Sequence, residues 1–140
     1  MAVEQTLILN KPDAVRRRLA AEILGRIEAR GFEIREGRLV TANRELGEEH
    51  YAEHREKPFF GELVAFITRG PLVAMVVEGG PDTWKTVRTM MGATNPLDSA
   101  PGTIRGDHAL EIGENVAHGS DSPASAEREI SIYFSDAELV

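Results

Sequence analysis

The sequence predicts a layered α/β fold, because segments with the spacing of helices alternate with segments that have the composition of strands. The clearest helix has apolar residues at every fourth position, at Val15, Leu19, Ile23 and Ile27. The clearest strand is PLVAMVV at 71–77, which is apolar almost throughout, as a strand buried on both faces should be. A chain of 140 residues can bury a core of its own, so we expect one domain over residues 1–140.

Helices and strands are expected along the whole chain except in one long loop. In order, they are a strand at 3–9, a helix at 12–30, a strand at 32–39, helices at 45–56 and 60–67, a strand at 71–77, a helix at 82–91 and a helix at 123–134. Pro12 suits the first turn of a helix, and Gly31 suits its end. A change of parity after Gly37 indicates a bulge, and Ser122 before Pro123 is a good cap for the last helix.

The loop at 92–112 contains the turn sequences TNP and PGT and has little periodicity. A loop of this length inside a compact domain is usually either functional or disordered. The segment is therefore a candidate for part of a functional site.

Composition favours a cytoplasmic enzyme or binding module and excludes several chemistries. The formal net charge of −7 argues against generic binding of nucleic acid through a basic surface. The absence of cysteine excludes disulfides, thiolate nucleophiles and zinc–thiolate sites. The N-terminal sequence MAVEQTLIL lacks a basic leader, and no apolar run is long enough to span a membrane. We therefore expect a cytoplasmic location and no membrane partner.

The sequence lacks the glycine-rich patterns GxxxxGK and GxGxxG that hold phosphates with backbone amides. If the protein binds a phosphate, side-chain cations must hold it. Three are suggestively placed: Lys11 after the first strand, Arg88 at the edge of an apolar helix face, and Arg105 in the long loop. Because most lysines and arginines are exposed, solvated surface positions are favoured when these residues are considered alone.

His118 ends a short apolar run in NVAHGSDS and is followed by small polar residues. Its pKa is expected near the usual value of about 6.5, so much of it is an unprotonated nucleophile or base near neutral pH. Gly119 would let a ligand approach, and Glu129 could accept a hydrogen bond from the second ring nitrogen. A histidine that only hydrogen-bonds within its own turn explains the motif about equally well.

The sequence HYAEH at 50–54 fits the H-x-x-E-H pattern of one class of zinc peptidases. His50 and His54 could share a metal ion on a helix, with Glu53 as a base. No downstream glutamate stands out as a third ligand, so a solvated helix face is the favoured interpretation. For the aromatic pair Phe59 and Phe60, burial of both in the core is the commoner outcome, although one could lie against a flat ligand.

Five sequence blocks in register carry a resemblance to a known family. They are KPDAV at 11–15, YAEH followed by KPFF within 51–60, GATNP at 92–96, PGTIRGD at 101–107, and NVAHGSDS with Glu129 after it. Together they resemble the nucleoside diphosphate kinases, and the match runs in order from about Thr6 to Phe134. The resemblance implies a ferredoxin-like α/β sandwich, in which helices cover a four-stranded antiparallel sheet.

The resemblance also implies an activity and its cofactor. The terminal phosphoryl group of a nucleoside triphosphate would pass to a nucleoside diphosphate by a ping-pong reaction, through a pros-phosphohistidine at His118. Mg²⁺ would be held mainly by the nucleotide phosphates, and no protein side chain is expected to be a metal ligand. Stacking of the base with few specific hydrogen bonds would give broad base specificity. A homo-oligomer is implied, most often a hexamer, with a tetramer or dimer as alternatives.

Site residues are implied one by one by the same resemblance. The residues matching those that hold phosphates and ribose are Lys11, Arg88, Thr94, Arg105 and Asn115. Phe59 matches the aromatic on which the base stacks. Lys11 also matches the catalytic lysine, and Tyr51 matches the tyrosine near it. Ser120 and Glu129 match the residues that steady the histidine.

Three features depart from the family pattern. The turn at 79–81 is one residue longer than usual, and we expect the turn to absorb the extra residue because the spacing from Arg88 to Thr94 is intact. His108 stands where an aromatic is more usual, with little effect expected. The chain ends at Val140, before the tail with which many relatives make subunit contacts.

Two alternatives to a nucleoside diphosphate kinase follow from the residues. One is a zinc-dependent hydrolase that uses His50 and His54. The other is a non-catalytic ferredoxin-like module that binds nucleotide or RNA. RNA is disfavoured by the negative charge and by the absence of an aromatic-rich sheet motif, so no specific nucleic-acid partner is expected.

Overall fold

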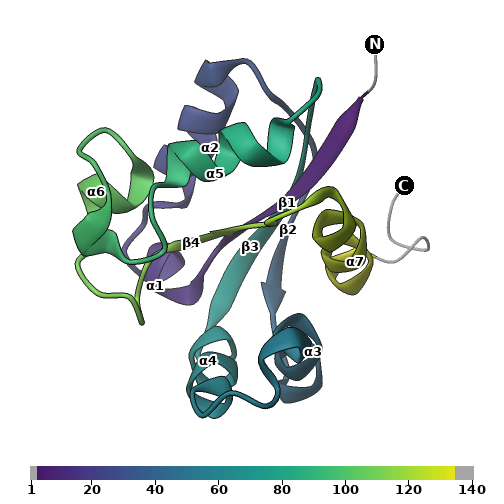
Figure 1. Cartoon of the computed structure of the whole chain (residues 1–140), viewed down its shortest axis with the longest axis vertical. Coiled ribbons are helices and arrows are strands. Elements are labelled where there is room, and N and C mark those ends of the chain that lie inside the picture. Colours follow the sequence, from purple (N-terminus) through teal and green to yellow (C-terminus); the bar gives the residue numbers. More distant parts are fainter. Residues whose placement is uncertain (1–2, 135–140) are drawn as a thin grey trace.

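A computed structural model describes residues 3–134 of the chain. Its elements alternate between strands and helices (Figure 1). In chain order they are β1 (Glu4–Asn10), α1 (Pro12–Arg16), α2 (Ala20–Arg30), β2 (Glu33–Thr41), α3 (Arg44–His50), the 3₁₀ turn η1 (Ala52–His54), α4 (Phe60–Ile67), β3 (Pro71–Gly79), α5 (Thr83–Met91), the 3₁₀ turn η2 (Pro96–Asp98), α6 (Ile104–His108), β4 (Ala117–Gly119) and α7 (Pro123–Tyr133).

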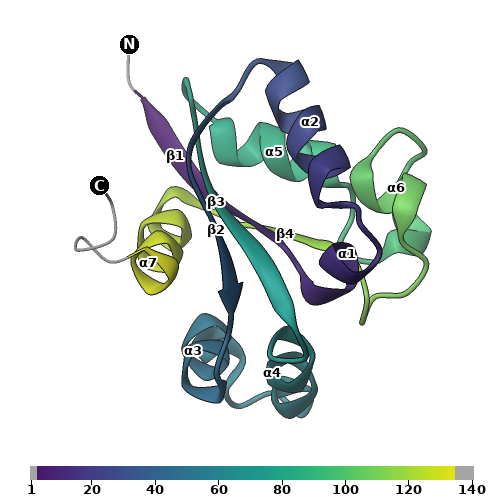
Figure 2. The same ribbon diagram turned by 180° about the vertical axis from the view of Figure 1, so that it is seen from behind.

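The strands form one four-stranded sheet in the order β2-β3-β1-β4, with every neighbouring pair antiparallel. Helices cover both faces: α2, α5 and α6 lie on one side, and α3, α4 and α7 lie on the other (Figures 1 and 2). This arrangement confirms the expected ferredoxin-like α/β sandwich. In the described range, no helix is both long and apolar enough to cross a membrane.

Side chains on the two central strands, β1 and β3, point alternately to the two faces of the sheet and form two separate cores. On β1, Ile8 packs into the core under α2 and α5, whereas Leu7 and Leu9 pack into the core under α4 and α7. On β3, Met75 and Val76 divide between the two faces in the same way. Because successive strand residues point to opposite faces, a strand buried on both sides must be apolar throughout, as the sequence of β3 is.

The helix expected at 12–30 is interrupted, which corrects the prediction. α1 ends at Arg16, Arg18 adopts a left-handed backbone with φ 63°, and α2 begins at Ala20. The bond from Leu19 N to Ala14 O, 2.9 Å long, closes the intervening turn. The apolar spacing continues across the break, and no glycine or proline marks it, so periodicity alone suggested one helix.

The position of the bulge, the end of one helix and the structure of the long loop also differ from expectation. The bulge in β2 lies between Ile34 and Glu36 and not after Gly37. The charged segment at 45–56 is a helix only to His50 and continues as a separate 3₁₀ turn. The segment at 92–112 is not structureless, because the side chains of Asn95 and Thr103 cap η2 and α6. Such caps satisfy the free amides at the start of a helix.

The expected cap of the last helix is confirmed, and the Arg88 contact agrees with the expectation for the turn after β3. The Ser122 side chain accepts a hydrogen bond from Ser125 N at 3.0 Å, as expected for the cap of α7. Arg88 reaches the end of β4, where its Nη1 atom donates to Gly119 O at 2.7 Å, as expected if the turn after β3 absorbs its extra residue. The chain end at Val140 lies outside the described residues.

His108 belongs to a polar cluster that ties α6 to α2. Its Nε2 atom lies 3.4 Å from Glu22 Oε2, and Arg26 Nη2 lies 2.8 Å from Asp107 Oδ2. The His108 side chain is 24% exposed, and the small effect expected for a histidine at this position stays a prediction.

Candidate active site

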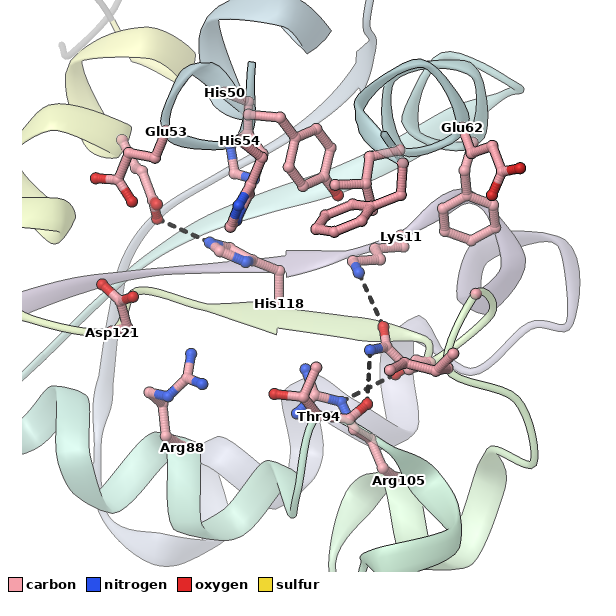
Figure 3. Close-up of a pocket in the computed structure, with 18 of the residues that line it drawn as sticks. Lys11, His50, Glu53, His54, Glu62, Arg88, Thr94, Arg105, His118 and Asp121 are labelled. Atoms are coloured by element: carbon pink, nitrogen blue, oxygen red, sulfur yellow. Dashed lines mark hydrogen bonds and ion pairs between the residues drawn. The ribbon is translucent and has the colours of Figure 1, made fainter. Parts of the chain in front are cut away.

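The candidate site is a cavity of about 620 Å³ lined by residues of α3 and α4 on one side and of α5 and α6 on the other, with β4 between them. Figure 3 shows His50, Glu53 and His54 on one wall, Arg88, Thr94 and Arg105 on the opposite wall, and Lys11 and His118 between them. The lining residues are Lys11, His50, Tyr51, Glu53, His54, Phe59, Glu62, Leu63, Phe66, Arg88, Thr94, Arg105, Ile112, Gly113, Asn115, His118, Asp121, Arg128 and Glu129.

His118 is fixed at one ring nitrogen and open to the cavity. It lies on β4 opposite Leu9 of β1, and 20% of its side chain is exposed. Its Nε2 atom lies 2.8 Å from Glu129 Oε1, and Ser120 Oγ donates to the same oxygen at 2.8 Å. A carboxylate beside Nε2 favours the tautomer with the hydrogen on that nitrogen, which leaves a free electron pair on Nδ1.

The surroundings of His118 keep its ring neutral. Burial is the largest effect and lowers the pKa of His118, and the charges of Lys11 and Arg88 lower it further, although Glu129 acts in the opposite direction. Burial also opposes ionisation of Glu129, but its hydrogen bonds with His118 and Ser120 outweigh that effect, so the pKa of Glu129 is lowered. At neutral pH the pair is therefore a neutral imidazole beside a carboxylate.

A strained turn sets the entry to β4. Val116 has φ 61°, and Ala117 N donates to Asn115 O across it at 2.7 Å, which makes a γ-turn. A β-branched residue rarely adopts this conformation. The buried carboxylate of Asp13 accepts a hydrogen bond from Val116 N at 3.0 Å, and Lys11 N donates to Val116 O at 2.9 Å. The start of α1 thus holds the turn that precedes His118.

Lys11 is buried, which corrects the expectation of a solvated surface charge. It is 8% exposed, and its Nζ atom donates to Asn115 Oδ1 at 2.8 Å. Burial, aided by the charge of Arg105 and opposed by that of Asp13, lowers the pKa of Lys11 to about 8. An ammonium group is thereby held inside the cavity with its charge poorly compensated.

Arg105 is also buried, at 5% exposure, so the surface expectation is wrong for it too. Its guanidinium donates to Gly92 O at 3.0 Å, to Asn115 O at 3.3 Å and to Ala117 O at 2.7 Å. Burial and the nearby charge of Arg88 lower the pKa of Arg105 to about 10. Arg88 itself is half-buried beside the cavity.

The remaining expected residues also reach the cavity, from different elements. Tyr51 is buried, and burial raises the pKa of its phenol well above the usual range. Asn115 Nδ2 donates to Thr94 O at 3.0 Å. Phe59 is 45% exposed at the rim, whereas Phe60 packs against the core under α4. Burial of both phenylalanines, the commoner outcome, is therefore not what is found.

The arrangement required by the zinc-peptidase pattern is absent. α3 ends at His50, and His54 follows on a 3₁₀ turn, where its ring lies 5.7 Å from that of Phe59. Among residues 3–134, the group of three possible ligands that lie close together is His50, His118 and Glu129, without His54. The two histidines of the pattern do not share one helix face.

Asp13 and Arg128 contribute to the site in ways that the sequence did not indicate. Asp13 supports the Val116 turn, whereas its sequence signals were its place in the first turn of the helix and in the KPDAV block. Arg128 places its Nη2 atom 3.8 Å from Glu129 Oε2, and its only signal was adjacency to that glutamate. Both are ordinary charged residues on helices, so their roles depend on the tertiary fold.

A neutral imidazole backed by a carboxylate, in a cavity with buried cations, suits phosphoryl transfer through histidine, so fold and site together define a phosphotransferase. The family model for nucleoside diphosphate kinase matches residues 4–139. The chain belongs to the nucleoside diphosphate kinase family and has its activity, the transfer of the terminal phosphoryl group from a nucleoside triphosphate to a nucleoside diphosphate.

Individual relatives agree with this family over nearly their whole length. The nucleoside diphosphate kinase of Archaeoglobus fulgidus is 57% identical over 138 residues, which cover 99% of this chain and 91% of that protein. That of Rubrobacter xylanophilus is 59% identical over 132 residues, covering 94% and 98%. The structure of a halophilic nucleoside diphosphate kinase from Halobacterium salinarum in complex with CDP matches with a TM-score of 0.94 at 48% identity, covering 99% of this chain and 92% of that chain.

Proposed function

We propose that the phosphoryl group passes through Nδ1 of His118 in two half-reactions. The observation that carries the proposal is the 2.8 Å contact between His118 Nε2 and Glu129, because it leaves Nδ1 with the free electron pair. That pair attacks the terminal phosphorus, and the bond to the leaving diphosphate breaks, with its electrons remaining on the leaving oxygen. In the second half-reaction, an oxygen of the acceptor diphosphate attacks the phosphohistidine, and the electron pair returns to Nδ1.

Glu129 and Ser120 are the positioning residues of this scheme. The ring becomes positively charged when Nδ1 is phosphorylated, and the Glu129 carboxylate beside Nε2 stabilises that charge. Ser120 fixes the carboxylate by donating to Glu129 Oε1, and its Oγ also accepts from Leu7 N at 3.3 Å. The histidine is therefore held by groups that are themselves anchored to the central strand.

Lys11, Arg88 and Arg105 are proposed to bind the phosphates. A lysine ammonium has three N–H donors and a guanidinium five. Among the described residues, Lys11 donates one hydrogen bond to Asn115, and Arg88 donates one to Gly119. Arg105 donates three hydrogen bonds to backbone carbonyls. Donors remain on each of the three for phosphate oxygens, which supports a shared phosphate site for donor and acceptor nucleotides.

The nucleoside is proposed to lie against Phe59 at the rim, with Thr94 and Asn115 near the phosphates and ribose, and Tyr51 beside Lys11. An exposed ring offers a stacking surface to any base, because every base has a flat face. Broad base specificity follows from such stacking. The halophilic relative was solved with CDP, which supports a nucleotide in the corresponding cavity of this chain.

Mg²⁺ is proposed to accompany the nucleotide and to neutralise charge on its phosphates. Magnesium prefers oxygen ligands and retains much of its water. The close group of possible ligands contains two imidazoles, which suit magnesium poorly, and buried cations surround it. The residues therefore fit an ion carried by the phosphates better than an ion held by protein side chains.

Apolar side chains on the surface support a proposal for the assembly of the protein. Leu97, Leu110 and Ile112 are exposed in the long segment before β4, and Leu39 is exposed on the edge strand β2. These apolar side chains support a homo-oligomer, with a hexamer proposed first and a tetramer or dimer as alternatives. Light scattering with size exclusion measures this directly. We also propose a cytoplasmic location and, from the family match over residues 4–139, a single domain.

The central test is covalent labelling with γ-labelled ATP. We expect the protein to take up label as a phosphoramidate, stable to alkali and lost in acid, and the His118→Gln variant to take up none. His108→Gln is the matched control, since it removes a histidine that lies on the surface cluster, and it should label as the parent does. Equal labelling of the His118→Gln variant would exclude the proposed intermediate.

A further inference from the structure

Three possible metal ligands meet inside the cavity although they come from three elements. His50 ends α3, His118 lies on β4 and Glu129 lies on α7, and one ligand atom of each lies within 4.8 Å of the others. His50 is 4% exposed, and its Nδ1 atom is buried without a hydrogen-bond partner among the described residues. We propose that these three side chains bind a zinc ion, and that the ion switches the kinase off.

The distances allow such a site with small movements. Three atoms no more than 4.8 Å apart always have a point within about 2.8 Å of each, whereas zinc needs about 2.0–2.2 Å to nitrogen or carboxylate oxygen. Shifts of less than an ångström at each side chain close the difference. The rings of His50 and His118 are already adjacent, with centroids 4.6 Å apart.

The ligand set selects zinc over the magnesium that accompanies nucleotides. Imidazole nitrogen is a good ligand for zinc, and two histidines with one glutamate form a known tetrahedral set that leaves a fourth position open. Magnesium prefers a shell of oxygens and would lose its water for two nitrogens. Lys11, Arg88 and Arg128 carry positive charge towards the same space, so we expect weaker binding than at a structural zinc site.

Bound zinc prevents Nδ1 of His118 from attacking phosphorus, whichever ring nitrogen the ion binds. A neutral imidazole has one nitrogen with a free electron pair, and the other carries the hydrogen. If zinc takes the pair on Nδ1, the nucleophile is occupied. If zinc displaces the hydrogen bond from Nε2 to Glu129, the hydrogen moves to Nδ1, and that atom can no longer attack phosphorus.

The first test measures zinc binding on the unphosphorylated chain, so its outcome does not depend on the proposed phosphohistidine; the inhibitory role rests on that proposed function and is tested separately. The protein is titrated with ZnCl₂ in excess MgCl₂ against a chromogenic zinc chelator. We expect one zinc per chain, at least tenfold weaker binding for His50→Phe, and unchanged binding for His54→Gln, a matched histidine of the same cavity. His118→Gln should also weaken zinc binding at least tenfold.

Two results of the zinc titration would overturn the proposal. One is equal zinc affinity in the parent chain and in whichever of His50→Phe and His118→Gln folds by circular dichroism. The other is a loss on His54→Gln as large as that on His50→Phe. In the parent chain, zinc should also prevent labelling by γ-labelled ATP despite excess magnesium, and removal of zinc with a chelator should restore it. Labelling that proceeds with zinc bound would exclude the inhibitory role.

Discussion

Raising the pH above neutrality should slow the enzyme while making the folded chain more stable, because both effects depend on the proton of Lys11. Burial chiefly lowers the pKa of Lys11 to about 8. At that value about nine-tenths of the lysine is charged at pH 7, about half at pH 8 and about one-tenth at pH 9. If the charged form holds the phosphates, kcat/KM should fall about tenfold between pH 7 and pH 9.

The stability effect has the opposite sign. The unfolded lysine keeps its ordinary pKa of 10.5, above the folded value of about 8. Between these two values the unfolded chain binds more protons than the folded chain, so the free energy of unfolding rises with pH. Below about 8 the lysine is charged in both states, and this rise disappears.

The assay is a pair of pH profiles over the same window. Initial rates at low nucleotide give kcat/KM, and urea unfolding gives stability. In Lys11→Arg the alkaline fall in rate should vanish whatever the absolute rate, because arginine stays charged. In Lys11→Met the rise in stability above pH 8 should vanish. A parent rate that stays flat to pH 9, or an unchanged fall in Lys11→Arg, would refute the reasoning.

Three other substitutions test separate contacts. Glu129→Gln removes the carboxylate charge beside His118 Nε2, and a hydrogen bond to a charged group contributes about 1.5–3 kcal/mol. Single-turnover labelling should therefore slow roughly 10- to 150-fold, and an unchanged rate would contradict the positioning role of Glu129. Asp13→Ala leaves Val116 N buried without a partner and should lower the free energy of unfolding in urea by about 1–3 kcal/mol, whereas Asp13→Asn keeps an acceptor and should lose less; equal losses would show that the bond is unimportant. Phe59→Ala should weaken purine and pyrimidine nucleotides alike by about 1–3 kcal/mol in titration calorimetry, and a loss confined to one base would argue against simple stacking.

The parts of the fold that sequence reasoning predicted are those with strong local signals. The apolar run of β3 and the serine–proline cap of α7 depend on neighbours in the chain, and both were found where expected. The break between α1 and α2 has no such signal, because Arg18 is a poor choice for a left-handed backbone and tertiary packing must impose it. β4 is three residues long, too short for a periodic pattern, and only the family resemblance implied a fourth strand.

At the site, residue identity was predictable but environment was not. Lys11, Arg105 and His118 were singled out from the sequence, yet the usual exposure of basic residues favoured the surface for the first two. In the fold, Lys11 donates to Asn115, which is 104 positions away, and Arg105 donates to three backbone carbonyls. Likewise, the γ-turn at Val116 contradicts local propensity and is held by a carboxylate about 100 positions away. The family motifs implied the roles of these residues, whereas neither the motifs nor composition and spacing predicted their burial or the γ-turn.

Arg105 joins the two ends of a chain excursion through its bonds to Gly92 O and Ala117 O. The exposed side chains of this excursion, such as Leu97 and Leu110, can therefore be replaced while Arg105 keeps its two ends together. The outer surface of the segment can then diverge in evolution without disturbing the phosphate-binding residues at its base.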